Sequence, residues 1–583
     1  MRTSLLSSLA LLAFLLACST SRPTPDVDTP EDVDGPAWFE DVTDAVGLDF
    51  VHDTGPAGAY FMPHSMASGC AFFHDGDRDR TLYLYLLQSA GPGSKSVNRL
   101  YRRRPDGTFQ DVTAGSGLGV AGHNMGVAIA DVNNDGLPDV LIAQYGGVKL
   151  FLNLGGGRFT DITAESGLHD PLWAASAAFF DYDRDGWLDL VVVNYLDYDP
   201  KRDCLSPQGA KDFCGPNAFN GTSSKLFRNR GPRPATADEP AARAFFEDVS
   251  FASGIGRLPG PGLGVACADF DGDGWPDLFV SNDGQPNRLW INRPNEDAKT
   301  AKVTPRVFVD EAVSRGVAYT AMGKSFAGMG IGLGDTANVG LLDLYVTHLD
   351  SESNTLWKQG PRGRFRDRTY ESGLASTRWR GTGFGVVMAD FDNDGSLDIA
   401  VVNGRVFSGG KAEGTDLGFW ETYAQRNQIF ANDGKGKFRD VSAANAAFCG
   451  HWNVGRGLAC ADFADDGAPG LLVNATGGRA RLFRNVAPNR GHWLKVRAVD
   501  PKLRRDAYGA EVRVRADGRE WLRSINPAEG FSSSSAAVAH FGLGKATKID
   551  SVLVTWPDGD RELFSGGAAD RQVELRKGEG RKP

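Results

Sequence analysis

Acidic residues at a fixed spacing could bind a metal ion in the stretch from Asp269 to Asp277. The aspartates at positions 1, 3, 5 and 9 are Asp269, Asp271, Asp273 and Asp277, and Gly274 stands at position 6. This spacing folds a short loop around a hard cation, because the carboxylates point inward and the glycine permits a sharp turn. Ligation by oxygen alone, without Cys or His, favours Ca²⁺ over zinc or copper.

An EF-hand is the main alternative for such a loop. It needs a bidentate Glu at position 12 and a helix on each side. Position 12 here is Val280, and the flanking segments 264–268 and 278–280 are short apolar runs. Runs of this kind are typical of strands. The pattern therefore predicts a calcium loop between two strands.

The loop recurs along the chain, with intact and degenerate copies. The other intact copies place their predicted calcium ligands at Asp131, Asn133, Asp135 and Asp139, at Asp181, Asp183, Asp185 and Asp189, and at Asp390, Asp392, Asp394 and Asp398. Three degenerate copies retain only Asp75, Asp77 and Asp79, Asp335 and Asp343, and Asp462 and Asp466. For each degenerate copy, a plain turn is a competing interpretation.

Two further motifs alternate with the loops. A Phe-x-Asp-Val-Thr type of strand begins at Phe39, Phe109, Phe159, Phe246 and Phe438, and a Leu-aromatic strand precedes most copies. One cycle of about 50 residues holds roughly four short strands, as in a propeller blade. The chain has seven cycles, and the last lacks its Phe-x-Asp strand, which the strand at Phe39 can supply. We therefore predict an all-β fold with a seven-bladed β-propeller over residues 37–487.

The motifs stop after Pro488, where a second module begins. Segments 492–497 and 510–515 alternate in strand fashion, and Asp517-Gly518 is a hairpin signal. We expect a small C-terminal β domain over residues 488–568, with a tail at 569–583. Its Arg residues at alternate positions predict a solvated face.

The N-terminus has the pattern of an export signal. An apolar run follows Arg2, is too short to span a bilayer, and ends at Leu15-Leu16-Ala17-Cys18. We expect a lipoprotein signal peptide at 1–17, lipidation of Cys18 and a flexible tether at 18–36. The protein would then be anchored to a bacterial membrane surface, the outer membrane or cell surface, and would otherwise be secreted.

The net charge and the cysteines limit the functions and metal sites that the chain could have. The net charge of -10 without basic runs argues against nucleic-acid binding. Cys204 and Cys214 flank a polar loop, and in an exported protein they predict a disulfide. We find no Cys or His spacing typical of a zinc site.

The motifs together resemble a known family. Residues 37–487 resemble FG-GAP/VCBS repeats, as in integrin α-subunit propellers. Residues 488–568 resemble the ASPIC/UnbV domain through His492-Trp-Leu-Lys-Val, Arg505-Asp-Ala-Tyr-Gly-Ala and His540-Phe-Gly-Leu-Gly. The two modules together are similar to the cartilage acidic protein family, including its bacterial lipoprotein members. This resemblance implies an extracytoplasmic, calcium-binding propeller whose integrin-like calcium loops lie on the face away from the ligand.

Three functions compete on these grounds. We expect a non-enzymatic binding or adhesion module that engages a glycan or protein partner. The candidates for an exposed binding surface are Trp173, Tyr195, Phe213, Phe219 and Trp420, which could equally pack between blades. A hydrolase or lyase acting on polysaccharide could use His123, His348, His451 and Arg456, but no spacing forms a nucleophile–base pair. A surface assembly scaffold is the third alternative.

Overall fold

The computed structural model describes residues 35–76, 80–206, 209–235, 242–296, 304–412 and 414–583 of the 583. The predicted signal peptide, Cys18 and the tether up to residue 34 lie outside these residues, as do Asp77 and Asp79. From residue 35 on, the described chain belongs to one compact unit. Among the described residues, no helix combines the length and the apolar character needed to cross a membrane.

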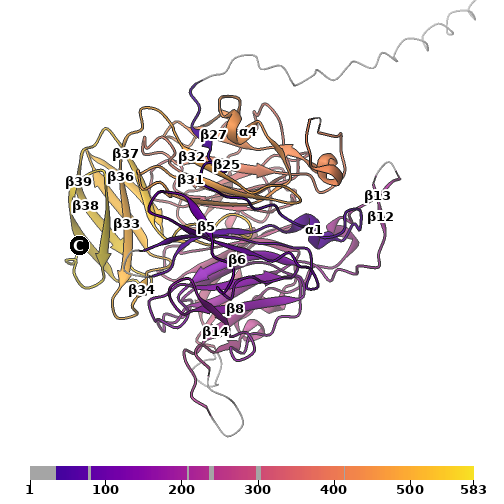
Figure 1. Cartoon of the computed structure of the whole chain (residues 1–583). Coiled ribbons are helices and arrows are strands. Elements are labelled where there is room, and N and C mark those ends of the chain that lie inside the picture. Colours follow the sequence, from indigo (N-terminus) through magenta and orange to yellow (C-terminus); the bar gives the residue numbers. More distant parts are fainter. Residues whose placement is uncertain (1–34, 77–79, 207–208, 236–241, 297–303, 413) are drawn as a thin grey trace, which may run out of the picture. The chain divides into compact units, whose positions relative to one another are not determined.

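Seven four-stranded antiparallel sheets form the blades of a β-propeller, which confirms the predicted fold class (Figure 1). In chain order, the strands of blades one to six are β2 (Cys70–His74), β3 (Leu82–Leu86), β4 (Arg99–Arg103) and β5 (Phe109–Asp111); β6 (Asn124–Ala130), β7 (Asp139–Gln144), β8 (Gly147–Asn153) and β9 (Phe159–Asp161); β10 (Ala174–Phe180), β11 (Asp189–Asn194), β14 (Lys225–Asn229) and β15 (Phe246–Asp248); β16 (Gly262–Ala268), β17 (Asp277–Asn282), β18 (Arg288–Pro294) and β19 (Arg306–Asp310); β20 (Ile331–Gly334), β21 (Asp343–Val346), β22 (Thr355–Gln359) and β23 (Phe365–Asp367); and β24 (Gly383–Ala389), β25 (Asp398–Asn403), β27 (Gln428–Asn432) and β28 (Phe438–Asp440).

The seventh blade joins the two ends of the repeat array. It consists of β30 (Gly455–Ala461), β31 (Gly470–Ala475), β32 (Arg481–Asn485) and β1 (Phe39–Asp41). The N-terminal β1 pairs antiparallel with β32, with Phe39 opposite Asn485. The first strands of all seven blades also contact one another in a closed ring, from β2 through β30 and back to β2. This closure, predicted from the missing strand of the last cycle, removes the exposed sheet edges of an open array.

The Phe-x-Asp motif forms the outermost strand of each blade for two physical reasons. In β9, the Phe159 side chain is buried against blade one, and its backbone N–H donates to Ser116 O at 2.6 Å. Asp161 ends the strand, because its Oδ1 accepts hydrogen bonds from the Thr163 amide and hydroxyl. A short polar side chain that bonds the backbone two residues ahead favours a turn.

Short helices and small hairpins decorate the connections between strands. The helices are α1 (Met62–Met66), α2 (Ser250–Ser253), α3 (Ala312–Arg315) and α4 (Ala446–Cys449), with 3-10 turns η1 (Pro216–Ala218), η2 (Ile255–Arg257), η4 (Gly418–Tyr423) and η5 (Ser442–Ala444). Two two-stranded ladders pair β12 (Cys204–Leu205) with β13 (Lys211–Asp212) and β26 (Gln425–Arg426) with β29 (Trp452–Asn453). The predicted disulfide is present, with the Cys204 and Cys214 sulfurs bonded at 2.04 Å.

The C-terminal domain consists of two further sheets around its own core. One contains β33 (His492–Asp500), β34 (Arg505–Asp506), β37 (Ala539–Gly544) and β40 (Arg571–Arg576). The other contains β35 (Glu511–Ala516), β36 (Arg519–Ser524), β38 (Lys548–Thr555) and β39 (Arg561–Ala568). The prediction of a tail at 569–583 is wrong, because β40 pairs in parallel with β33 and packs Val573 and Leu575 against the domain core.

Candidate functional site

Each predicted metal loop joins the first strand of a blade to the second. In blade three, the Oδ1 and Oδ2 atoms of Asp181 accept hydrogen bonds from the Asp185 and Gly186 amides, at 3.1 and 3.0 Å. Asp189 begins β11 and accepts from the Tyr182 and Asn229 amides, at 3.0 and 2.8 Å. Gly186 has a φ of +91°, in the left-handed region that glycine adopts without strain. The backbone therefore fixes positions 1 and 9 and turns sharply between them.

The loops bring the predicted ligands together in three of the four intact copies. One carboxylate oxygen from each residue of a set lies within 4.8 Å of the others, and the sets are Asp181, Asp183 and Asp189; Asp269, Asp271 and Asp273; and Asp390, Asp392 and Asp398. The fourth predicted ligand of each copy, Asp185, Asp277 or Asp394, does not belong to its set. In the copy of blade two, Asn133 donates Nδ2–H to Asp135 Oδ2 at 2.9 Å. Asp131 and Asp135 nevertheless raise the pKa of Asp139, in addition to the larger effect of burial.

Burial and like charge make these carboxylates costly to ionise. Burial, with a smaller contribution from neighbouring aspartates, raises the pKa of Asp181 to about 7 and that of Asp392 to about 6. The pKa of Asp398 is well above its usual value for the same two reasons. Asp390 is fully buried, and its Oδ1 has no hydrogen-bond partner in the described structure. A divalent cation would neutralise this charge and occupy these oxygens, so the residues present fit a hard metal ion.

Arginines neutralise part of this charge in two loops. Arg293 and Arg315 each place a nitrogen 3.0 Å from Asp271 Oδ2 in blade four. Arg228 Nη2 lies 2.6 Å from Asp183 Oδ2 in blade three. A metal ion in these loops would share its aspartate ligands with a guanidinium group.

The degenerate loops replace a missing ligand set with donors from the protein. In blade five, the Thr336 hydroxyl donates a short hydrogen bond to Asp343 Oδ2. In blade seven, Lys495 of the C-terminal domain places Nζ 2.6 Å from Asp462 Oδ2. Both side chains of this ion pair are nearly buried, at 9% and 5% exposed. An ammonium group therefore occupies the negative loop of blade seven.

The C-terminal domain contacts the same face of the propeller at other loops. Arg505 donates Nε–H to Asn134 Oδ1 at 2.8 Å in blade two and Nη2–H to Gly186 O at 3.3 Å in blade three. At blade six, the Gly544 amide donates to Asn393 O at 2.8 Å. The prediction of a solvated arginine face is therefore wrong for Arg505 and Arg523, which are 3% and 7% exposed. The sequence pattern does not reveal that this side of the domain packs against the propeller.

The segment 526–536 of the C-terminal domain fills the centre of the propeller. It makes direct contacts with the first strand of every blade: Ser534 and Ser533 with β2, Ser532 with β6 and β10, Asn526 with β16, Gly530 with β20, Phe531 with β24, and Ser535 and Ala536 with β30. The exchanged bonds between Gly530 and Ile331 are 2.7 and 3.0 Å long. We call this segment the plug.

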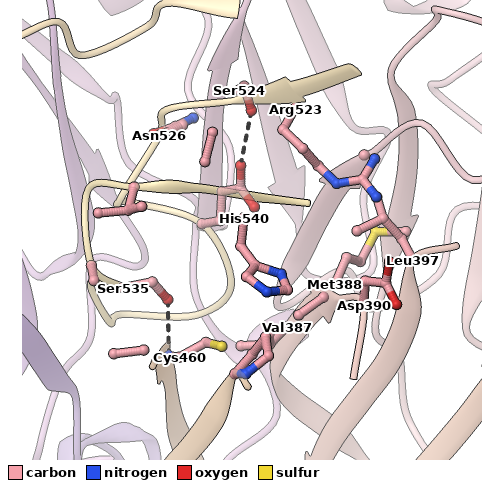
Figure 2. A pocket seen from close by; sticks show the side chains of 18 of the residues that line it. Val387, Met388, Asp390, Leu397, Cys460, Arg523, Ser524, Asn526, Ser535 and His540 are labelled. Carbon is pink, nitrogen blue, oxygen red and sulfur yellow. Dashed lines mark hydrogen bonds between the residues drawn. The ribbon is translucent and has the colours of Figure 1, made fainter. Parts of the chain in front are cut away.

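A cavity of about 140 Å³ lies beside the plug, between the C-terminal domain and blades five to seven. Figure 2 shows Arg523 and His540 of the C-terminal domain with Asp390 and Cys460 of the propeller around it. The Ser535 hydroxyl accepts from the Cys460 amide at 3.1 Å, and His540 Nε2 bonds Gly467 O at 3.0 Å. These hydrogen bonds join the C-terminal domain to the propeller along the wall of the cavity.

The aromatic residues proposed for an exposed binding surface are mostly inside the protein. Trp173, Tyr195, Phe213 and Trp420 are 1–5% exposed, and Phe219 is half-buried. They stack in aromatic clusters that hold the inserts of blades three and six together. The prediction of exposure is wrong for the four buried rings, because the inserts fold back on one another instead of projecting into solvent.

The residues considered for catalysis are held by structural hydrogen bonds. His348 is 1% exposed, and its Nδ1 lies 3.0 Å from Ala327 O. Arg456 is fully buried and donates to four carbonyl oxygens, those of Ser65, Gly404, Gly455 and Arg405. His123 bonds Ser89 O, and His451 is half-buried. Backbone carbonyl oxygens therefore bond the side chains of His348, His123 and Arg456.

Two family profiles match parts of this chain. The profile of the FG-GAP-like repeat matches residues 75–142, 131–192 and 335–401, which span calcium-loop candidates of blades one to three, five and six. The profile described as ASPIC and UnbV matches residues 500–582. The latter match includes β40, in agreement with its place in the C-terminal domain.

Curated relatives and solved structures show more distant similarity. The chain is 26% identical to cartilage acidic protein 1 of Xenopus tropicalis over 497 residues, 77% of this chain and 72% of the relative. It is 26% identical to the human protein over 347 residues, about half of the human length. A lectin of Agrocybe aegerita that recognises non-reducing terminal N-acetylglucosamine matches at 15% identity, with 64% and 80% of the two chains covered and a TM-score of 0.34. A rhamnogalacturonan lyase of Bacillus licheniformis matches at 14% identity over 75% of each chain, with a TM-score of 0.30.

TM-scores this low carry no conclusion about function. The repeats and the similarity to cartilage acidic protein 1 indicate an extracellular binding or adhesion module. This chain is an FG-GAP-like repeat protein with an ASPIC and UnbV domain, and it is homologous to cartilage acidic protein 1.

Proposed function

We propose that this protein is a calcium-stabilised, non-enzymatic binding or adhesion module that engages a glycan or protein partner outside the cytoplasm. The observation that carries the calcium assignment is the set of three carboxylates gathered within 4.8 Å in each of blades three, four and six. Oxygen-only ligands in a flexible loop suit Ca²⁺, which accepts six to eight oxygens. Calcium would fix the loops between the first two strands of these blades.

The face away from the calcium loops is the better candidate for a large partner. The C-terminal domain covers much of the loop face, and the plug fills the centre of the ring. Antiparallel strands place the connections between the second and third strands, and those between blades, at the opposite ends of the strands. These connections carry exposed apolar side chains, including Phe251, Val313, Met322 and Tyr370, at 69–74% exposed. Exposed apolar groups on loops held by a rigid scaffold favour partner binding.

We also propose that the mature chain is tethered to a bacterial membrane surface through a lipid on Cys18. The support is the Leu15-Leu16-Ala17-Cys18 sequence after a short apolar run. Metabolic labelling with a clickable fatty acid tests this directly. Wild-type chain should be labelled and Cys18→Ala should not; equal labelling of the two would contradict the anchor.

Metal content and thermal unfolding together test the calcium assignment. About four calcium ions per chain, with a large fall in melting temperature on chelation and no rescue by Mg²⁺, are the expected results. No bound calcium and no shift would refute it. Screening the calcium-loaded protein against glycan arrays and extracellular protein libraries then tests the binding role, and Met322→Glu should reduce capture of a partner by the face away from the loops.

A further inference from the structure

The loop of blade four faces an open cleft between the propeller and the C-terminal domain. The cleft has a volume of about 410 Å³ and is lined on one side by Asp269 and Asp273 and on the other by Glu511, Arg513 and Arg561. Ligand sites of proteins commonly have volumes of about 300–1,000 Å³ and often lie between domains. The dimensions of this cleft suit a small molecule better than a folded partner.

The loop of blade four differs from the loops of the neighbouring blades in its contacts with the C-terminal domain. The loops of blades two, three, five, six and seven each receive a direct hydrogen bond from the C-terminal domain. The loop of blade four is linked to the C-terminal domain through Arg362 of blade five, whose Nη2 lies 3.5 Å from Asp269 Oδ2 and 3.6 Å from Glu511 Oε1. Asp273 remains exposed on the cleft side. A cation in this loop could therefore be approached from the cleft.

The charges that line the cleft depend on that cation. The lining contains four carboxylates, Asp181, Asp269, Asp273 and Glu511, and three guanidinium groups, Arg362, Arg513 and Arg561. Without metal, the carboxylates exceed the guanidinium groups by one. A divalent ion in the loop of blade four would add two positive charges beside these guanidinium groups, so an anionic ligand would meet a more favourable field in the calcium-loaded protein than in the metal-free one.

We propose that this cleft binds an acidic sugar in a calcium-dependent manner. Its carboxylate would pair with Arg561 and Arg362, and its hydroxyl groups would bond Glu511 and the oxygen-seeking cation. The cleft offers both hydrogen-bond acceptors and donors, which suits a ligand with several hydroxyl groups and one carboxylate. An acidic peptide fits less well, because Glu511 would repel a second carboxylate. The inference rests on the proposed calcium function and assigns it a ligand class.

The test is titration calorimetry of the full chain with acidic disaccharides built from galacturonic, glucuronic, mannuronic or guluronic acid, each beside its neutral counterpart. We expect at least one acidic disaccharide to bind in calcium, its neutral counterpart to bind at least tenfold more weakly, and chelator to abolish binding. Arg561→Gln should weaken binding about tenfold. The control, Arg515→Gln, alters a 65% exposed arginine outside the cleft and should leave affinity unchanged.

The outcomes separate failure of the ligand from failure of the metal. Calcium bound at the expected stoichiometry without binding of any acidic disaccharide would overturn the cleft proposal alone. Equal affinity in Arg561→Gln and Arg515→Gln would also overturn it. Absence of calcium from the protein would instead remove the proposed function on which it rests, and calorimetry with CaCl₂ alone reports this separately.

Discussion

The Lys495 ammonium lies 2.6 Å from the Asp462 carboxylate in the loop of blade seven, and both side chains are nearly buried between two domains. The copies of this loop in blades three, four and six gather three carboxylates, whereas the copy in blade seven has Ala464 and Gly470 at two ligand positions. A protein cation therefore neutralises Asp462 in a loop that has lost two of its metal ligands. It also joins the C-terminal domain to the propeller without calcium.

Replacement of Lys495 by methionine should destabilise the protein by about 3 kcal/mol or more, because it leaves a buried carboxylate without a partner. Denaturant unfolding measures this loss, which should be the same with calcium and with chelator. The double variant Lys495→Met/Asp462→Asn should recover much of the stability, since it removes the orphaned charge. A matched control is Lys149→Met, which breaks an exposed pair with Asp161 and should cost less than about 1 kcal/mol. Similar losses in the two single variants would contradict the buried role.

Truncation of Phe531 should loosen the plug. Its ring is 1% exposed and packs edge-on against Phe384, with the centroids 5.0 Å apart. Phe531→Ala should cost about 3–5 kcal/mol, as for other buried phenylalanines. Hydrogen exchange should also rise in the first strands of the blades, which pair with the plug. Phe251→Ala removes a ring that is 74% exposed and should change neither quantity. Unchanged exchange in Phe531→Ala would show that the plug does not hold the ring.

The repeat pattern predicts the propeller because it records local physics. The aspartates at positions 1 and 9 bond backbone amides within their own blade, as Asp181 and Asp189 do. The Phe-x-Asp strand needs only a buried ring and a turn, which Phe159 and Asp161 supply. Each blade therefore repeats the same short-range solution, and seven copies make the fold evident.

The plug and the domain contacts follow from long-range geometry that the pattern does not contain. Residues 526–536 contain four Ser, two Ala and one Gly and have the composition of a surface loop. Small side chains fit at the centre of a ring where seven strands converge, as at Gly530, where an added Cβ would lie 2.8 Å from Val386 O. Arg505 lies between the two alternating segments, and only the folded chain shows that it spans the loops of blades two and three.

The aromatic residues of the inserts are a second case in which the sequence pattern does not contain the long-range contacts. Tryptophans such as Trp173 and Trp420 are expected on a binding surface, but from the sequence alone they could equally pack between blades. Burial of both rings decides for packing. Hydrophobic composition alone cannot distinguish a contact with a partner from a contact within the chain.

Substitution of one calcium ligand should lower the metal content by one ion. In blade six, Asp390→Asn should lose one calcium and, at a calcium concentration 100 times the dissociation constant, about 2.7 kcal/mol of calcium-dependent stability. Asp335→Asn in blade five is the control, because Asp335 stands at the same loop position and accepts hydrogen bonds from two loop amides, whereas the Thr336 hydroxyl already bonds the second carboxylate, Asp343. The control should lose stability without losing calcium. Metal analysis of the two variants distinguishes these results, and loss of an ion from Asp335→Asn would show that blade five also binds metal.

The pH dependence of stability should reverse when calcium is removed. Burial raises the folded-state pKa of Asp131 and Asp181 to about 7 from an ordinary value of 3.8. Between these values, the folded metal-free chain holds protons that the unfolded chain has released, so its stability is fully present below about pH 4 and is lost as the pH rises towards about 7. Calcium competes with those protons, and its stabilisation should therefore grow over the same interval. Thermal unfolding at several pH values from 5 to 7.5 should show a falling melting temperature in chelator and a level or rising one in excess calcium. A melting temperature that rises with pH in chelator would contradict protonation of the free loops.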